Sequence, residues 1–224
     1  MRHEVLADLA AAIPQIVGAG TMNNGQACVA QTRVLLPRRR YREGVDALAA
    51  AVGALVVGDP AEMTTQIGPL VAERQRERVL GYVAKGKAEG ARCVVGGGRP
   101  KGFDRGWFVE PTLFADVDNR MTIAQEEIFG PVLTVIPFDD EQDAIRIANE
   151  SSYGLAGNVM SGSLERGLAV ARRLRAGFIS VNGTAPYGAD VPFGGYKASG
   201  IGRQNGIAGF DQYTELKSVG HPVA

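Results

Sequence analysis

Short apolar runs alternate with longer segments of helical periodicity along most of this sequence, and this alternation strongly restricts its fold. Helical segments are expected at about 5–20, 42–51, 71–89, 139–149 and 164–174. Extended segments are expected at 33–36, 92–95, 107–114, 131–138, 157–160 and 177–182. Such alternation is typical of parallel strands joined by helical crossovers. The sequence therefore predicts an α/β fold with an open, mostly parallel sheet.

The 224 residues are enough for one main domain, which we place at 1–205. The remaining residues, 206–224, are expected to form a short helix near 206–210 and then a strand-like tail over 212–219. A terminal strand that no helix follows leaves backbone groups unpaired until another strand covers them. We therefore expect an oligomerisation strand that pairs with the sheet edge of a partner subunit, in a homo-oligomer.

Composition excludes several classes of partner. Lys and Arg together number 24, and Asp and Glu also number 24, so no net charge attracts nucleic acid or an anionic membrane. No apolar stretch reaches the roughly 20 residues that span a bilayer, and the N-terminus shows no signal-peptide pattern. We expect no nucleic-acid partner, no membrane association and a cytoplasmic location.

The two cysteines, Cys28 and Cys93, lie in unlike surroundings and form no C-x-x-C pair. This argues against a metal site and against a disulfide framework. Cys93 lies in a predicted strand and is expected in the core. Cys28 requires a separate argument, because its sequence surroundings are unusual.

Cys28 follows the small-residue turn Asn24-Gly25 and precedes a segment that could form a helix. Amide donors and the positive end of a helix dipole would stabilise a thiolate there, which suits a nucleophile. A lone cysteine is more often a small buried residue, so both interpretations stand on this segment alone. The two histidines, His3 and His221, lie close to the termini, which disfavours a Cys-His dyad. The base for a nucleophilic Cys28 would be a carboxylate or lie outside this chain.

Two further blocks lie far along the chain. Gln-Glu-Glu-Ile-Phe-Gly-Pro occupies 125–131, and Pro-Phe-Gly-Gly-Tyr-Lys-Ala-Ser-Gly occupies 192–200. The second block is dense in glycine, which lets the backbone approach another group closely. Together with Asn-Gly-Gln-Ala-Cys at 24–28, these blocks resemble three motifs of the NAD(P)-dependent aldehyde dehydrogenase superfamily, in the same order and at similar spacing. The resemblance runs from about residue 6 to 219 and concerns the family's catalytic portion.

The resemblance implies roles for three residues. Cys28 would attack the aldehyde as a thiolate, giving a thiohemiacetal that loses hydride to the nicotinamide and then a thioester that is hydrolysed. Its backbone amide would be half of the oxyanion hole. Glu127 would hold the nicotinamide ribose hydroxyls, although its chemistry alone indicates a helix-end or salt-bridging carboxylate. Phe129 would line the nicotinamide side of the pocket. The implied cofactor is NAD or NADP, and the implied substrate is a small-molecule aldehyde.

One family segment has no counterpart here. The family's Glu-Leu-Gly-Gly-Lys sequence carries its general-base glutamate, whereas Glu4 lacks the residues that would follow it. No G-x-G-x-x-G or P-loop sequence replaces the family's dinucleotide-binding domain. We therefore expect an N-terminally truncated catalytic domain that does not oxidise aldehydes alone at a useful rate. A separate nucleotide-binding chain would be a suitable partner, and an apolar patch should lie where the missing domain would pack.

Two alternatives stay open. The chain could be a non-catalytic assembly or regulatory subunit of the same fold, or a CoA-acylating aldehyde dehydrogenase, which differs in how the thioester is released. The residues expected along the aldehyde tunnel are Met22, Ala27, Val29 and Tyr187, which indicate a modest apolar pocket.

Overall fold

The computed structural model describes residues 8–183 and 188–222. Its helices are α1 (Leu9–Thr21), α2 (Tyr41–Gly53), α3 (Glu73–Ala88), α4 (Thr122–Gln125), α5 (Glu141–Asn149), α6 (Leu164–Ala171) and α7 (Gly206–Phe210). Its strands are β1 (Arg33–Pro37), β2 (Arg92–Val95), β3 (Thr112–Ala115), β4 (Val132–Phe138), β5 (Ala156–Val159) and β6 (Phe178–Val181). Each segment expected from 33 to 210 therefore contains the predicted type of element.

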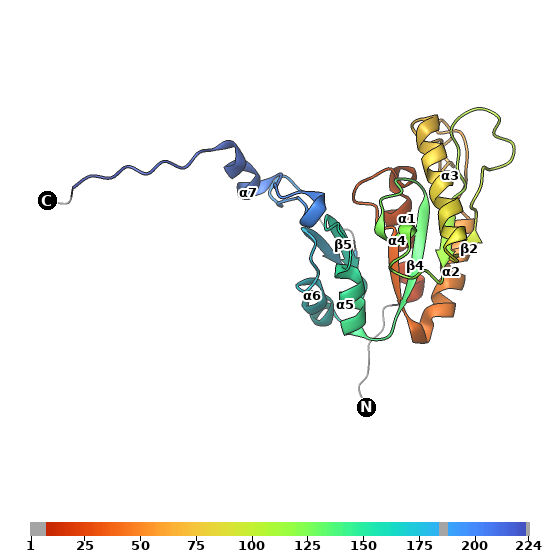
Figure 1. The fold of residues 1–224 in the computed structure, drawn as a ribbon, viewed down its shortest axis with the longest axis horizontal. Coiled ribbons are helices and arrows are strands. Elements are labelled where there is room, and N and C mark those ends of the chain that lie inside the picture. Colours follow the sequence, from red (N-terminus) through yellow and green to blue (C-terminus); the bar gives the residue numbers. More distant parts are fainter. Residues whose placement is uncertain (1–7, 184–187, 223–224) are drawn as a thin grey trace.

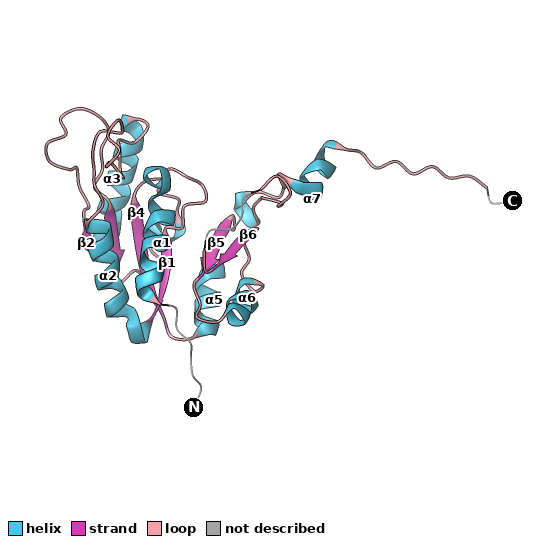
Figure 2. Cartoon of the chain, turned by 180° about the vertical axis from the view of Figure 1, so that it is seen from behind, coloured by secondary structure: helices cyan, strands magenta, loops and turns pink. Residues whose placement is uncertain are grey.

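The strands form two sheets. The larger sheet has the order β1-β4-β3-β2, in which β4 is parallel to both neighbours and β2 is antiparallel to β3. The smaller sheet pairs β5 with β6 in parallel. The two sheets lie side by side, with helices on both faces of the larger one (Figure 1, Figure 2). The expected mostly parallel α/β architecture is confirmed.

Strand β4 lies at the centre of the core, and its side chains alternate between two hydrophobic clusters. Val132 and Ile136 belong to a cluster with residues of α3, α4 and α5. Leu133 and Val135 belong to a second cluster, with residues of α1 and α2. All four side chains are at most 3% exposed, as expected for a strand covered on both faces. Helices α1 and α2 therefore lie on one face of the sheet, and α3, α4 and α5 lie on the other.

Helix α5 follows β4 almost immediately. Asp140 caps the N-terminus of α5, because its side chain accepts a hydrogen bond from the Asp143 amide at 2.8 Å. Helix α6 packs beside α5, and the Arg166 guanidinium contacts the Glu141 carboxylate at 2.7 Å. These contacts join the smaller sheet to the larger one through its covering helices.

The expectation of a helix after Cys28 is wrong. No helix follows Cys28, because the chain makes a turn there and then enters β1 directly. Helix α3 has a buried arginine, since Arg76 is only 7% exposed and stacks over Trp107. Its charge is paired with Glu73 and Glu77, which explains how it can be buried.

The ends of the described chain are less regular. Residues 5–7 of the first expected helix lie outside the described residues, and α1 begins at Leu9 after the cap Asp8. Within the expected tail strand at 212–219, residues 212–213 end a short 3-10 helix, Asp211–Tyr213, and residues 214–219 form an exposed extended segment without strand pairing within the described single chain. It projects away from the sheets (Figure 1). Within the described ranges, no helix is both long enough and apolar enough to cross a membrane.

Candidate active site

A left-handed turn places Cys28. Asn23, Asn24 and Gly25 have φ angles of 51°, 58° and 71°. Asparagine and glycine adopt this conformation more readily than other residues. The turn lies between α1 and β1, and the next turn, closed by a hydrogen bond from the Ala30 amide to the Ala27 carbonyl at 2.9 Å, contains Cys28. The two turns leave Cys28 exposed.

The side chains of Asn24 and Gln26, next to Cys28 in the sequence, hydrogen-bond to the loop at 68–71. Asn24 Oδ1 accepts from the Gly68 amide at 2.9 Å, and its Nδ2 donates to the Pro69 carbonyl at 3.1 Å. Gln26 Oε1 accepts from the Val71 amide at 3.0 Å. These three bonds satisfy backbone groups of a loop without regular structure. The asparagine and glutamine of the motif therefore support the turn rather than the chemistry.

One cavity of about 490 Å³ brings together Cys28, Glu127 and Phe129. The three residues, predicted from two separate sequence blocks at 24–28 and 125–131, thus line a single site. The cavity lies between the two sheets, and its further lining residues include Ala27, Arg33, Tyr153, Gly154, Leu155, Asn158, Arg175, Ala198 and Ser199. Of the expected tunnel residues, Ala27 lines this cavity, Met22 and Val29 are not among its lining residues, and Tyr187 lies outside the described residues.

Helix α3 holds the backbone around Glu127 and Phe129. Arg78 Nη2 donates to the Glu127 carbonyl at 2.6 Å, and Gln75 Nε2 donates to the Phe129 carbonyl at 2.6 Å. Phe129 has a φ of 61°, a conformation that costs a non-glycine residue about 1–3 kcal/mol. The bond from Gln75 helps to keep this strained residue in place on the cavity wall.

The Glu127 side chain is exposed on the cavity wall and has no hydrogen-bond or ion-pair partner among the residues that the structure describes. Its neighbour Glu126 instead accepts a hydrogen bond from the Tyr82 hydroxyl at 2.7 Å. Both oxygens of Glu127 are therefore available to an external pair of hydroxyl donors. The acceptor oxygens of Glu127 suit the hydroxyl donors of a ribose, and Phe129 supplies an apolar surface beside them.

The glycine-dense block supports the opposite wall of the cavity. Lys197 Nζ donates to the carbonyls of Asn149 and Ser151 at 2.8 and 2.9 Å. Ser199 Oγ accepts from the Gly154 amide at 3.0 Å. Burial, followed by the charges of neighbouring arginines, lowers the pKa of Lys197. The glycine-dense block therefore stabilises the loop at 149–154 through these hydrogen bonds.

Sequence reasoning missed Gln75, Arg78 and Lys197. Lys197 lies inside a recognised block, so its motif was the available signal. Gln75 and Arg78 gave no comparable signal, because their acceptors lie far along the chain at Glu127 and Phe129. The described histidine, His221, lies in the exposed tail and does not line the cavity. No group of three potential metal ligands occurs within 8–183 or 188–222.

The family model for the aldehyde dehydrogenase family matches residues 5–219. This chain belongs to the aldehyde dehydrogenase family. Among its relatives, geranial dehydrogenase of Castellaniella defragrans is 48% identical over 213 residues, which cover 95% of this chain and 44% of that protein. Betaine aldehyde dehydrogenase of Brucella melitensis is 46% identical over 215 residues, with the same coverage of 95% and 44%.

Solved structures of aldehyde dehydrogenases share the fold. An aldehyde dehydrogenase of Mycobacterium tuberculosis complexed with NAD+ gives a TM-score of 0.92 at 55% identity, covering 97% of this chain and 46% of that one. The NAD+ complex of a Bacillus cereus aldehyde dehydrogenase gives a TM-score of 0.91 at 46% identity, covering 96% and 43%. This chain therefore spans less than half the length of these family members.

Proposed function

We propose that this chain carries the nucleophile and part of the cofactor-facing wall of an NAD(P)-dependent aldehyde dehydrogenase active site. The observation that carries the proposal is the single cavity that Cys28 lines together with Glu127 and Phe129, about a hundred residues further along the sequence. The substrate class is a small-molecule aldehyde, in keeping with relatives named for geranial and betaine aldehyde.

Cys28 supplies the attacking sulfur. Its Sγ, as thiolate, forms a bond to the aldehyde carbonyl carbon while the carbonyl π electrons move to oxygen, and the Cys28 amide donates to that oxygen. Glu127 and Phe129 would hold the nicotinamide cofactor, whose chemistry would be to take up hydride from the tetrahedral carbon on Cys28. The resulting thioester on Cys28 is hydrolysed by water, which releases the carboxylic acid and regenerates the thiol. The exposed position of Cys28 on the cavity supports this role.

Glu127 and Phe129 orient the cofactor in this proposal. The Glu127 carboxylate accepts hydrogen bonds from two ribose hydroxyls, and Phe129 packs beside the nicotinamide. Three features support these roles: an unpaired exposed carboxylate within the described chain, a backbone held by Gln75 and Arg78, and a common cavity with Cys28. The cofactor is NAD or NADP.

The base that activates water lies, in this proposal, in the part of the aldehyde dehydrogenase fold outside the matched portion. Glu126 and Glu127 are the carboxylates that line the cavity within the described residues, and Glu126 is bonded to Tyr82. Loss of a general base costs about 10²–10⁴-fold in rate. The chain alone should therefore not oxidise aldehydes with NAD+ at a useful rate, and a separate nucleotide-binding chain or further sequence would restore turnover.

The division into a catalytic domain at 1–205 and a tail at 206–224 is part of the same proposal. Helix α7 begins at Gly206, and the exposed segment after it carries apolar side chains suited to a partner strand. We place the working enzyme in the cytoplasm as a homo-oligomer that swaps this tail between subunits.

An activated ester tests the nucleophile directly. With p-nitrophenyl acetate, Cys28 Sγ attacks the ester carbonyl, p-nitrophenolate leaves, and one acetyl thioester should remain on Cys28. Mass spectrometry should find this adduct in the wild-type chain and in Cys93→Ala, and not in Cys28→Ala. Equal labelling of Cys28 and Cys93 would contradict a selective nucleophile.

The same adduct separates the alternatives. Absence of an adduct at Cys28 would favour a non-catalytic assembly or regulatory subunit. Release of the acetyl group by added CoA, and not by water in the presence of the missing domain, would favour a CoA-acylating enzyme. Formation of NADH at the rate of a full-length enzyme would overturn the proposed dependence on an external base.

A further inference from the structure

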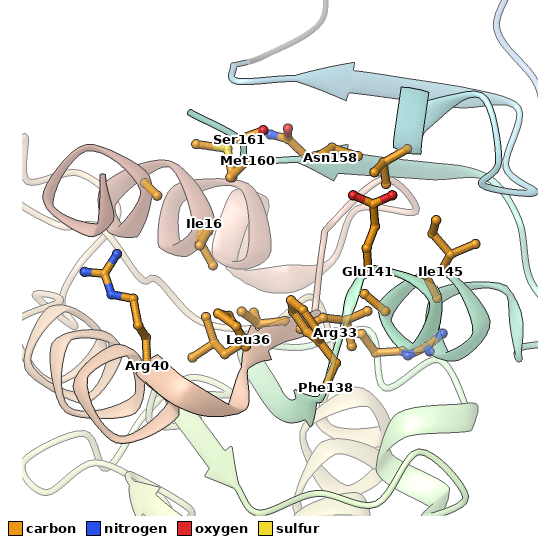
Figure 3. Close-up of a pocket in the computed structure, with 18 of the residues that line it drawn as sticks. Ile16, Arg33, Leu36, Arg40, Phe138, Glu141, Ile145, Asn158, Met160 and Ser161 are labelled. Atoms are coloured by element: carbon orange, nitrogen blue, oxygen red, sulfur yellow. The ribbon is translucent and has the colours of Figure 1, made fainter. Parts of the chain in front are cut away.

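Arg76 is a buried cation that does not line the cavity of Cys28. Arg33, by comparison, lines both that cavity and a second cavity of about 360 Å³, which Figure 3 shows with Arg33 on its wall. Arg76 lines neither of the two cavities, and it is 7% exposed. A buried charge is unfavourable unless it is paired and hydrogen-bonded. The burial of Arg76 therefore requires an explanation other than contact with a ligand in either cavity.

The guanidinium of Arg76 lies over the ring of Trp107. The carbon at its centre is 5.0 Å from the ring centroid, within the range of a cation–π contact. Two carboxylates fix the guanidinium, since Nε donates to Glu77 at 2.8 Å and Nη2 donates to Glu73 at 3.0 Å. Both carboxylates and the arginine belong to α3. The stack therefore holds Trp107 against the first turns of this helix.

Trp107 in turn holds the loop that precedes α3. Its carbonyl accepts a hydrogen bond from the Leu70 amide at 3.0 Å. The Leu70 side chain is 3% exposed and belongs to the same hydrophobic cluster as Val79 of α3, and Trp107 packs against that cluster. The loop at 68–71 contains no helix or strand. Its position therefore depends on contacts such as these.

The loop is bonded on its other side to the turn that precedes Cys28. Three hydrogen bonds join the side chains of Asn24 and Gln26 to the backbone of 68–71. A continuous series of contacts thus leads from the buried cation through Trp107 and the loop to the turn of Cys28. Energetic coupling between separate sites is carried by packed side chains and hydrogen bonds of this kind.

We propose that Arg76 and Trp107 are positioning residues for Cys28. Their stack fixes the loop at 68–71, and the loop fixes the turn that presents the Cys28 sulfur to the cavity. This inference rests on the proposed function in taking that sulfur as the reacting atom. A displacement of about 1 Å at a reacting group can cost about 10²-fold in rate, so a contact outside the cavity can control reactivity.

The test measures how fast Cys28 reacts in the full, folded chain. Iodoacetamide is the first probe, because the thiolate displaces iodide and forms a thioether without a cofactor or a base, and p-nitrophenyl acetate is the second. Mass spectrometry of peptides separates Cys28 from Cys93. Arg76→Met removes the guanidinium and should slow both reactions at Cys28 by about tenfold. Arg74→Met, at an exposed position of α3, should stay within about twofold of wild type.

Variants of Trp107 separate the stack from general packing. Trp107→Tyr keeps an aromatic ring under the cation and should react within about threefold of wild type, whereas Trp107→Leu should be slower by about tenfold. This pair carries the test if Arg76→Met does not fold. Trp107 is the one tryptophan of the sequence, so its fluorescence reports the stack directly. Acrylamide quenching should rise by about twofold in Arg76→Met, and unchanged quenching would contradict the stack.

A double-mutant cycle identifies the route. Asn24→Gly removes two of the bonds to the loop and tolerates the φ of 58° at this position. It should slow the reaction with iodoacetamide by about tenfold, and adding Arg76→Met should slow it by less than about a further twofold, because both act through the loop. Additive effects would overturn the route.

The two probes distinguish failure of this inference from failure of the proposed function. Equal rates in wild type, Arg76→Met and Trp107→Leu, with an acetyl adduct on Cys28 in each, overturn the positioning role and leave the nucleophile intact. Absence of the acetyl adduct in wild type contradicts the proposed function. In that case a slower reaction of Arg76→Met with iodoacetamide still supports the positioning of the sulfur, and an equal rate overturns it.

Discussion

Gly25 and Gly130 pack backbone against backbone: a Cβ atom added to Gly25 would lie 2.0 Å from the Gly130 carbonyl oxygen. Gly25 belongs to the turn before Cys28, and Gly130 follows Phe129 directly. Gly25 also has a φ of 71°, which side chains rarely tolerate. The contact therefore holds the turn before Cys28 against the segment that contains Phe129, and it explains the glycine at 25, whereas a Cβ atom at Gly130 would meet the Val79 side chain.

Gly25→Ala should destabilise the fold by more than about 2 kcal/mol, because backbone strain adds to a clash with a carbonyl that cannot move freely. Gly18→Ala is the control, since a Cβ there meets nothing within 4 Å in the middle of α1. That variant should gain about 0.5–1 kcal/mol from reduced backbone entropy. Urea denaturation measures both, and equal stabilities for the two variants would contradict the role of this contact.

Gln75→Ala should increase the mobility of the backbone around Phe129. The substitution removes the Nε2 donors to the carbonyls of Phe129 and Ile128, at 2.6 and 3.2 Å, and should cost about 1–2 kcal/mol. Hydrogen exchange should increase at 127–130. Arg74→Ala, at the exposed neighbouring position of α3, should stay within about 0.5 kcal/mol of wild type. Unchanged exchange at 127–130 in Gln75→Ala would show that other contacts hold the strained residue.

Some features of the fold and of the candidate site could be predicted from the sequence, and others could not. Asp140 was predictable as a cap because a local rule applies to an aspartate between an apolar run and a helical pattern. The positions of Cys28, Glu127 and Phe129 in one cavity were expected from motif order. The partners Gln75 and Arg78 were not, because helical periodicity places them on a solvent face until residues about fifty positions away fold over them.

The environment of Cys28 was predicted incorrectly for a physical reason. Small residues before a cysteine suggested a helix start, whereas successive left-handed residues at Asn23 and Asn24 reverse the chain into β1. Likewise, the alternation of strands and helices predicted one mostly parallel sheet. The structure instead has two sheets, with β1 at the edge of one and β5 at the edge of the other. Register and adjacency depend on contacts between distant segments, which no local pattern contains.

Ionisation of Tyr41 should make the free energy of unfolding depend on pH in the alkaline range. Its hydroxyl accepts from the Asp116 amide at 2.6 Å and donates to the Val135 carbonyl at 3.2 Å. Burial of the phenol raises its pKa from 10.0 to about 12. The folded protein therefore holds the proton more tightly than the unfolded chain, so this contribution is complete below pH 10 and is lost as the pH rises to about 12.

Tyr41→Phe should remove that part of the pH dependence and cost about 1–3 kcal/mol near neutral pH, because the Asp116 amide loses its acceptor. Denaturation at a series of pH values from 8 to 12 measures the effect, and the difference between variant and wild type should shrink above pH 10. Tyr213→Phe, in the exposed tail, should match wild type throughout. A constant difference across the series would exclude Tyr41 as the titrating group.

The tail should determine the oligomeric state. Tyr213, Leu216 and Val219 are 90%, 105% and 84% exposed in the tail that projects from the fold (Figure 2). Burial of one leucine contributes about 1.5–3 kcal/mol, so Leu216→Lys should weaken association by about tenfold to a hundredfold. Met63→Lys, at an equally exposed residue, should leave association unchanged. Analytical ultracentrifugation should find an oligomer for wild type that dissociates in Leu216→Lys, and a wild-type chain that stays monomeric at all concentrations would contradict a role for the tail in assembly.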